Sequence, residues 1–302
     1  MFPIIPAASA ADKGNQGIMG FGWTGSNTAV TNIVTNAGVV GTDVSGVGTA
    51  KHNLAGCEYG GDKGIFGYGY DSAPTYTAGT NLVSSAGVVG TDVTGVGTAR
   101  WGLAACSYGG DKGIFGYGTA VGWTGTLSMT NLVTNAGVVG TDVTGVGSNR
   151  YYLAGTEYGG DKGIFGYGYN GVSMTNKVSN AGVVATDTSG VGTGRNNLTG
   201  CRYGTDTSLF GFGRSSSDTT LVSITNLVSN TGVVASDQAA TTGTARRDLG
   251  ACEYDNDKAI FAFGNTGSAT AVSNLVSNTG VIATDVTGVG TARSQLAACN
   301  FN

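Results

Sequence analysis

The stretch Leu103–Gly118 reads LAACSYGGDKGIFGYG, and the chain repeats it with few changes. Closely similar copies begin at Leu54 and Leu153, and more divergent copies begin at Leu198 and Leu249. Each copy places two short apolar runs on either side of a turn sequence, Gly-Gly-Asp-Lys or a variant of it. Gly suits such a turn because it adopts positive φ without strain. The stretch therefore predicts a β-hairpin that the chain uses repeatedly.

Other phrases recur in step with this hairpin, so the repeat extends well beyond it. The last glycine of the hairpin phrase, or of its counterpart, lies at Gly22, Gly69, Gly118, Gly168, Gly213 and Gly264. Variants of Gly-Val-Gly-Thr-Ala-Arg end in a basic residue at Lys51, Arg100, Arg150, Arg195, Arg246 and Arg293. These positions define six units of about fifty residues that cover nearly the whole chain.

Each unit contains four short runs of strand character that are separated by turn sequences. In the unit that follows Arg100 the runs are LAACSY, KGIFGYG, MTNLV and GVVGTDV. No window shows the 3.6-residue period of an amphipathic helix. Four antiparallel strands in each unit predict an all-β fold, a six-bladed β-propeller built from four-stranded repeats. The chain begins inside one unit and ends on the first strand of a unit, so we expect its N- and C-terminal strands to pair and close the ring.

The sequence predicts one propeller domain over residues 15–302, preceded by an N-terminal arm over residues 1–14. The opening MFPIIPAASA ends in a small-residue triplet, but it lacks a basic n-region, and Pro3 and Pro6 interrupt its short apolar run. These features argue against a signal peptide, and we expect the arm to dock on a partner instead. No apolar run approaches the roughly 18 residues that a membrane helix needs, so membrane insertion is not expected.

The composition is rich in glycine and poor in charge. Of the 302 residues 55 are Gly and 11% are charged, while 40% are hydrophobic, which favours packed β-structure over disorder. The 15 Lys and Arg residues are scattered and the net charge is −4, so the chain offers no basic patch for nucleic acid. Nucleic acid is therefore not an expected partner.

The run Arg100–Gly118 resembles a kelch repeat. In kelch repeats an Arg leads the inner strand and the second strand ends in a double glycine, which here reads Gly-Tyr-Gly. The tryptophan typical of the outer kelch strand is replaced by valines. A propeller of the chromosome-condensation-regulator type is the alternative, but the His-Thr pair of its inner strand is absent. The kelch resemblance implies that the Leu-Ala-Ala-Cys strand is innermost, and that the residues just after the repeat Arg lie at the mouth of a central channel, where such propellers bind ligands.

The residues available for catalysis are few. Kelch-like folds include copper oxidases of the galactose oxidase type, which require paired histidines, whereas His52 is the single histidine of this chain. One histidine also excludes a multi-His zinc site and argues against a Ser-His-Asp triad. An enzyme would need a carboxylate pair, such as Asp248 with a neighbour at the channel mouth. We therefore predict a protein with no catalytic function, no cofactor and no metal site.

The cysteines recur at one position of the inner strand. They are Cys57, Cys106, Cys201, Cys252 and Cys299, and Thr156 takes this place in the remaining unit. A disulfide needs Cα atoms within about 7 Å, and equivalent positions of successive blades are expected to lie farther apart. We predict free thiols packed in the core, which suit folding in a reducing cytoplasm.

Acidic residues also recur, and we assign them to structure. A series that follows Thr or Ser comprises Asp43, Asp92, Asp142, Asp187, Asp237 and Asp285. These carboxylates are expected to bond local backbone in turns or to brace the repeat Arg between blades. The Asp-Lys pairs at the hairpin tips are interpreted as turn residues with solvated lysines, since one Asp beside a Lys makes a poor calcium site.

The residues that follow the repeat Arg or Lys change from unit to unit while their neighbours hardly change. They include His52, Asn53, Trp101, Tyr151, Tyr152, Asn196, Asn197, Arg247, Asp248 and Gln295. The phrase Gly-Trp-Thr-Gly adds Trp23 and Trp123 on loops. Exposed Trp and Tyr rings can stack on sugars or anchor a protein interface, so we predict a ligand-binding site here. The alternative is that these positions are unconstrained and have drifted.

Near-identical repeats, low charge and missing catalytic residues resemble proteins of phage particles, in which propellers serve as tail, fibre or decoration components. The resemblance implies a virion protein that is assembled in the host cytoplasm. Its partners would be other structural proteins of the assembly, contacted in part through the N-terminal arm. The alternative function is a lectin-like or receptor-binding propeller that recognises a cell-surface glycan or receptor. A cytoplasmic or cell-surface location is the alternative to the virion.

Overall fold

The structure is a computed structural model that describes residues 15–72, 75–120, 122, 124–169, 171–215, 220–238 and 243–301. Every helix or strand element in these residues is a β-strand, so the prediction of an all-β fold is confirmed. The predicted N-terminal arm and Trp123 lie outside the described residues.

Five small antiparallel sheets follow one plan along the chain: an inner strand, its hairpin partner and an outer strand. They are β3 (Ala55–Tyr59), β4 (Lys63–Gly67) and β7 (Thr80–Val83); β8 (Ala104–Tyr108), β9 (Lys112–Gly116) and β10 (Thr130–Val133); β11 (Ala154–Tyr158), β12 (Lys162–Gly166) and β13 (Thr175–Val178); β15 (Thr199–Tyr203), β16 (Thr207–Gly211) and β18 (Thr225–Val228); and β19 (Gly250–Tyr254), β20 (Lys258–Asn265) and β21 (Ala269–Val276). Two short pairs lie between them, β5 (Tyr70–Ser72) with β6 (Thr75–Tyr76) and β14 (Arg195–Asn196) with β17 (Arg214–Ser215).

A sixth three-stranded sheet combines the two ends of the described chain. It consists of β1 (Gln16–Trp23), β2 (Asn27–Val34) and β22 (Ala297–Phe301), with β1 in the middle. The register of β22 on β1 runs from Gln16 opposite Phe301 to Gly20 opposite Ala297. Thus β22 occupies the place that the inner strand holds in the other five sheets.

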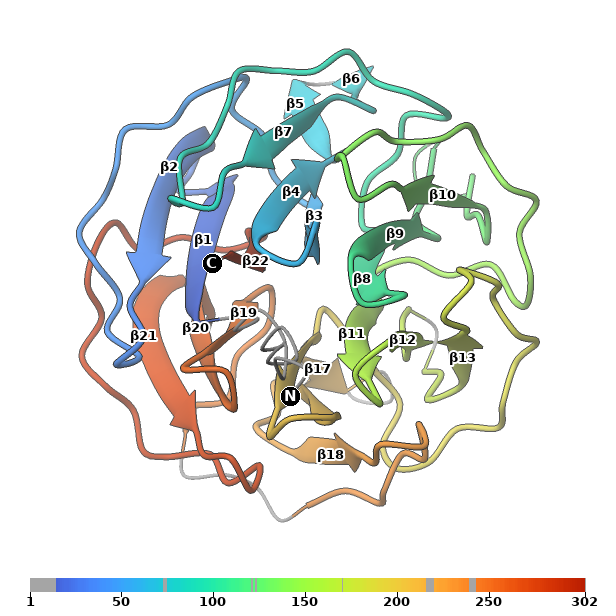
Figure 1. Ribbon diagram of the computed structural model, residues 1–302. Helices are drawn as coiled ribbons and strands as arrows, with labels where there is room; N and C mark the ends of the chain where they lie inside the picture. The colour runs from blue at the N-terminus through green and yellow to red at the C-terminus, as the bar shows by residue number, and fades with distance from the viewer. Residues whose placement is uncertain are drawn as a thin grey trace, which may run out of the picture.

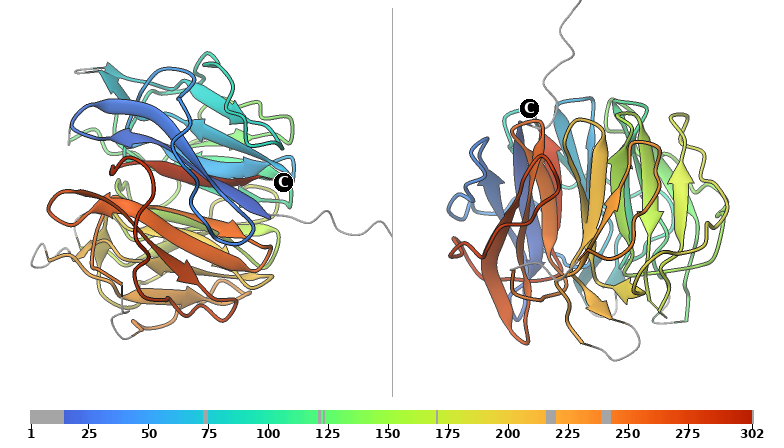
Figure 2. Two further views of the ribbon diagram at one scale, coloured as in Figure 1. Left: turned by 90° about the vertical axis from the view of Figure 1, so that its left-hand side faces the viewer. Right: turned by 90° about the horizontal axis from the view of Figure 1, so that it is seen from below.

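The six sheets lie around a common centre with their inner strands nearest to it (Figure 1). Each inner strand contacts the inner strand of the next sheet, in the order β22, β3, β8, β11, β15 and β19, and β19 contacts β22. Figure 2 shows the same sheets from two further sides, with the strands running roughly along the central axis.

The predicted fourth strand of each unit is wrong, because its residues form only isolated bridges. In the sheet of β1 and β2, Thr31 lies opposite Val44 and Val34 lies opposite Val40, so the outer run carries one extra residue between the two bridges. The buried side chain of Asn32 fills this interruption and donates hydrogen bonds to Gly41 O and Asp43 Oδ1, each at 2.9 Å. A side-chain amide thus replaces part of the backbone ladder, as at a β-bulge.

Cysteine and glycine pack the inner strands of neighbouring sheets closely together. The Sγ of Cys57 lies only 2.6 Å from the position that a Cβ on Gly113 of the next sheet would occupy. All five cysteines are buried and free, which confirms the predicted core thiols. Burial raises the pKa of Cys57 to about 12, so this thiol stays protonated at neutral pH.

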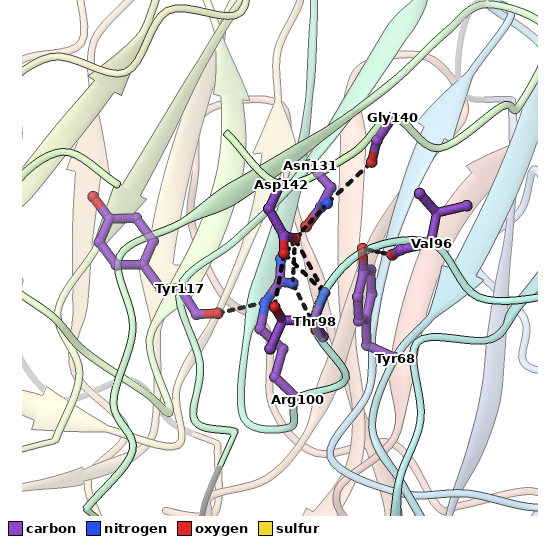
Figure 3. Close-up of polar contacts among 8 residues, drawn as sticks. All are labelled: Tyr68, Val96, Thr98, Arg100, Tyr117, Asn131, Gly140 and Asp142. Carbon is purple, nitrogen blue, oxygen red and sulfur yellow. Dashed lines mark hydrogen bonds and ion pairs between the residues drawn. The ribbon is translucent and has the colours of Figure 1, made fainter. Parts of the chain in front are cut away.

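A polar cluster joins each sheet to the loop that leads into it, and Figure 3 shows the copy around Arg100. Asp142 accepts hydrogen bonds from the N–H and the hydroxyl of Thr98 at 3.0 and 2.7 Å, and from Asn131 Nδ2 at 2.9 Å. The buried guanidinium of Arg100 donates to Tyr117 O, Thr98 O and Asn131 Oδ1 at 2.8, 3.1 and 2.7 Å. We call Thr98, Arg100, Asn131, Asp142 and their counterparts the clasp.

The aspartate contact of the clasp recurs in every unit. Its other copies pair Asp43 with Thr291, Asp92 with Thr49, Asp187 with Ser148, Asp237 with Thr193 and Asp285 with Thr244. The repeated aspartates therefore bond the backbone and hydroxyl of the incoming loop, which lies 39–44 residues away in five units, and the predicted bonding of local turn backbone is wrong. Bracing of the Arg is weaker, since Asp142 lies 4.0 Å from Arg100 Nη1.

The cation of each clasp also covers an aromatic ring of the preceding sheet. The guanidinium carbon of Arg100 lies 4.3 Å from the ring centroid of Tyr68. Counterparts of this pair are Lys51 on Phe21, Arg150 on Tyr117, Arg195 on Tyr167, Arg246 on Phe212 and Arg293 on Phe263. Such contacts stabilise a desolvated cation, so they help to join adjacent sheets.

Candidate functional site

A circle of backbone hydrogen bonds joins the residues two positions after each repeat Arg or Lys. Each N–H donates to the carbonyl of the preceding unit at 2.7–3.0 Å, in the pairs Asn53 to Gln295, Gly102 to Asn53, Tyr152 to Gly102, Asn197 to Tyr152, Asp248 to Asn197 and Gln295 to Asp248. All six residues have φ between 52° and 61°. We call them the belt. The left-handed backbone turns the N–H and C=O of each residue toward opposite neighbours.

The belt brings together five of the residues that the sequence analysis singled out, and the others flank it. The inner strands below it line a cavity of about 160 Å³. Each belt residue precedes a leucine of this lining: Leu54, Leu103, Leu153, Leu198, Leu249 and Leu296. The belt therefore lies at one mouth of the central cavity, where the kelch resemblance placed a ligand site.

Eight aromatic side chains form a continuous series over one half of this face. The series, which we call the aromatic arc, comprises Trp23, His52, Tyr70, Tyr76, Trp101, Tyr151, Tyr152 and Tyr169. Neighbouring ring centroids in the arc are 4.8–6.3 Å apart. Ring contacts at these distances hold the side chains in fixed orientations.

Exposure differs along the aromatic arc. Trp23 and Tyr169 are 39% and 42% exposed. Trp101 and Tyr151 are 6% and 3% exposed, so the expectation that both rings are exposed is wrong. Trp101 is buried because three rings surround it, with the Tyr152 centroid at 5.4 Å. The buried rings support the exposed ones rather than meeting a ligand themselves.

His52 is a packing residue of the arc. Its ring lies 5.1 Å from Trp23 and 5.0 Å from Tyr70 by centroids, and its Nδ1 is 2.6 Å from Asn27 Oδ1. Burial lowers the pKa of His52 to about 4, so the ring is neutral at pH 7. A neutral, stacked imidazole that donates to an amide oxygen orients its neighbours and is a poor general base.

The other half of the face is polar. Asn196 and Asn197 are buried, and Asn197 Nδ2 donates to Asp248 Oδ1. Arg247 Nε lies 3.6 Å from Asp248 Oδ2, and Gln295 completes this half of the belt. Burial raises the pKa of Asp248 to about 6, although Arg247 and Asn197 lower it. The face thus presents aromatic surface on one side and amide and charged groups on the other.

A second ring, of polar and charged residues, lines the cavity, and it was not predicted from the sequence. It consists of Glu58, Ser107, Glu157, Arg202, Glu253 and Asn300. Arg202 Nη2 lies 2.7 Å from Glu253 Oε2, and Arg202 Nη1 lies 3.3 Å from Glu157 Oε1. Burial raises the pKa of Glu253 well above its usual range, against the effect of Arg202. A signal was available in the sequence, because the residue at this position of the inner strand changes from each unit to the next, although Glu occurs three times.

Within the described ranges, no three His, Cys, Asp or Glu side chains are grouped so that they could hold a metal ion. Nor does that part of the chain contain a helix that is long and apolar enough to cross a membrane.

Comparison with known protein families finds no family that matches the chain. No curated protein matches it either.

Proposed function

We propose that the chain is a closed, six-bladed, kelch-like β-propeller. Three observations support closure: the belt runs through all six units, β19 contacts β22, and Asp43 bonds Thr291 as the other clasps do. The Thr291 contact spans 248 residues of sequence and has the same geometry as contacts that span about 40. The kelch likeness itself rests on the leading Arg and the Gly-aromatic-Gly end of the second strand.

We further propose that this propeller is a non-catalytic binding module that recognises a cell-surface glycan or receptor through its aromatic arc. The observation that carries the proposal is the arc itself, with its exposed ends at Trp23 and Tyr169. Aromatic faces stack on the apolar faces of sugar rings, and the polar half of the belt supplies hydrogen-bond partners beside them. Buried rings hold the exposed ones in place, so little side-chain entropy is lost on binding.

Binding to a glycan array by the wild type, Trp23→Ala and Tyr169→Ala tests this function. We expect specific binding by the wild type and at least a tenfold loss in each variant, with unchanged unfolding curves. Val183→Ala is the control, because it removes a still more exposed apolar side chain from the outer edge. Absence of wild-type binding to arrays and to intact cells would overturn the proposal.

The role of Asp248 supports the absence of catalysis. Hydrolysis by a carboxylate pair would need a second acid beside it. Asp248 instead faces Arg247 and Asn197. The carboxylate pair that an enzyme would need is therefore not assembled around this residue within the described part of the chain.

A second candidate is a structural role in a phage particle, assembled in the host cytoplasm and contacting other structural proteins. The observation in its favour is one strongly exposed valine at the outer edge of each unit, 57–65% exposed: Val39, Val88, Val138, Val183, Val233 and Val281. Repeated exposed apolar side chains suit contacts in an assembly. The test is the protein inventory of purified particles, in which this chain should occur at a fixed stoichiometry. Its absence would contradict the role and leave a cytoplasmic or cell-surface location.

A further inference from the structure

One clasp differs from the other five, because Lys51 stands where they have Arg. The guanidinium of Arg100 reaches Tyr117 O, Thr98 O and Asn131 Oδ1 with three nitrogens. The single Nζ of Lys51 reaches Asn81 Oδ1 at 2.8 Å and Gly79 O at 3.3 Å. Arg150 and Arg195 also bond one backbone carbonyl and one Asn Oδ1, so the clasp of Lys51 differs from its counterparts chiefly in having a smaller cationic group.

A pocket of about 500 Å³ opens beside Lys51. Its polar lining includes Thr49, Lys51, Asp71, Tyr76, Thr77 and Asp92. The β5–β6 pair forms one side, and the outer run that holds Asp92 forms another. The volume falls in the range of small-molecule sites, which is roughly 300–1,000 Å³.

The Asp71 side chain marks this pocket as a site with a missing donor. Its Oδ1 atom is buried and has no hydrogen-bond partner among the described residues. Asn27 Nδ2 donates to the Asp71 carbonyl, which fixes the backbone at this residue. Buried carboxylate oxygens normally have partners, because leaving one unpaired costs the desolvation free energy of the group. A ligand hydroxyl at this position would provide the donor.

The charges of the pocket favour a neutral ligand with several hydroxyl groups. Two carboxylates, Asp71 and Asp92, face one ammonium group, so an anion would be repelled. Asp92 already accepts from Thr49 and Asn81, and Lys51 has two partners for its three protons. The groups left to bond a ligand are thus the acceptor Oδ1 of Asp71 and one N–H of Lys51.

The pocket adjoins the aromatic arc through Tyr76. This ring lines the pocket, and its centroid lies 5.5 Å from that of Tyr70 and 6.3 Å from that of Trp101. An aromatic ring beside a carboxylate acceptor is a common arrangement for a pyranose, which offers an apolar face and directed hydroxyl groups.

We propose that the pocket beside Lys51 binds one uncharged pyranose unit and gives the aromatic arc its specificity. Asp71 accepts hydrogen bonds from ring hydroxyls, Lys51 donates to a hydroxyl or ring oxygen, and Tyr76 stacks against the sugar. The inference rests on glycan binding by the arc, and it adds the position and the neutral character of the selected sugar.

Calorimetric titration of the full chain with a panel of methyl pyranosides, neutral and acidic, tests the inference. We expect binding of at least one neutral pyranoside at millimolar concentration and none of the uronic acids. Asp71→Asn and Lys51→Arg should each lower that affinity at least tenfold. Asp111→Asn, which changes an aspartate at a hairpin tip, is the matched control and should have no effect. Unchanged melting temperatures in Asp71→Asn would separate lost binding from unfolding.

Failure of this inference and failure of the proposed function give different results. If an array glycan binds and Trp23→Ala abolishes it while Asp71→Asn and Lys51→Arg do not affect it, the pocket is not the specificity site. If no methyl pyranoside binds the wild type, the pocket proposal is also overturned. If neither array glycans nor pyranosides bind, both proposals fail together.

Discussion

The cation of the clasp lies two positions before the belt residue in every unit, yet the two positions differ in how much they vary. The clasp position holds Arg five times and Lys once, whereas the belt position holds five residue types in six units. Arg100 belongs to the clasp, and its side chain makes three hydrogen bonds that hold the incoming loop on its own sheet. Gly102 belongs to the belt, where main-chain N–H and C=O groups make the bonds. The side chains of the clasp make the contacts and are restricted to a cationic residue, whereas a backbone circle leaves its side chains free to differ. The belt can therefore vary in chemistry while the architecture stays constant.

Removal of a clasp cation should have the largest effect on stability. Arg100→Met is expected to lower the free energy of unfolding by about 3–5 kcal/mol, because it leaves buried acceptors on Tyr117 and Asn131 without donors. Urea denaturation measures the change. Lys112→Met is the control, since this exposed lysine pairs only with its neighbour Asp111 and should cost less than about 0.5 kcal/mol. A loss below 1 kcal/mol in Arg100→Met would show that the clasp does not join the sheets.

A belt carboxylate should behave in the opposite way. Asp248→Asn is expected to raise the free energy of unfolding by about 2–3 kcal/mol at pH 7, because burial raises the pKa of Asp248 to about 6 in the folded state. A raised pKa means that the group favours folding at low pH and that this contribution is lost as the pH rises through about 6. The gain should therefore vanish near pH 3.5. A destabilised variant at pH 7 would contradict this account.

A clasp carboxylate should show the reverse pH profile with a smaller effect. Asp142→Asn is expected to cost about 1 kcal/mol at pH 7, because Thr98 loses a charged acceptor. Burial alone would raise the pKa of Asp142, but the hydrogen bonds from Thr98 and Asn131 lower it below 3.8. Its contribution is thus present above about pH 4 and is lost as the pH falls through the folded-state pKa. Unfolding curves of Asp142→Asn at pH 3 and pH 7 measure the difference, which should be smaller at pH 3.

The smallest effect should come from the belt backbone. Gln295 has a φ of 57°, which strains a residue with a Cβ atom. Gln295→Gly is expected to gain about 0.5 kcal/mol after the entropy of the added glycine is counted. Gly102→Ala, at a φ of 61°, should lose a similar amount. Thermal unfolding of both variants measures the two changes in stability. If both variants gain or both lose stability, backbone strain is excluded as the cause.

The sequence was sufficient for those features that depend on a repeated local pattern. The hairpins and the core thiols follow from short phrases such as Gly-Gly-Asp-Lys and Leu-Ala-Ala-Cys, and the structure contains them. The interruption of the fourth run into isolated bridges was not predictable. It arises because the Asn32 side chain replaces backbone hydrogen bonds, and the spacing of the valines gives no sign of this. The burial of Trp101 depends on Tyr76, Tyr151 and Tyr152, which come from other loops and strands.

The belt was predicted as a set of variable residues but not as a circle. Residues such as Tyr152 and Gln295 give no sign in the sequence that they adopt positive φ, since such residues rarely do. The ring of cavity-lining residues around Arg202 was not predicted, although its residue type changes from each unit to the next, as that of the belt does. Its significance lies in contacts across three inner strands, between Glu157, Arg202 and Glu253, which no local phrase contains.

The pairing of β22 with β1 in the sixth sheet brings the two ends of the described chain together, so the chain could start at another turn. Tyr59 pairs with Lys63 across a turn of three residues, and Phe301 pairs with Gln16 in the corresponding register. A Gly-Gly-Asp linker from Phe301 to Gln16 would therefore rebuild a hairpin that the other units already contain. New ends could then be opened at the turn over residues 60–62. In this circular permutant the sheet of β3 and β4 would combine the two ends of the chain. The order of the sheets in space thus depends on their contacts with one another, and several orders along the chain are compatible with it.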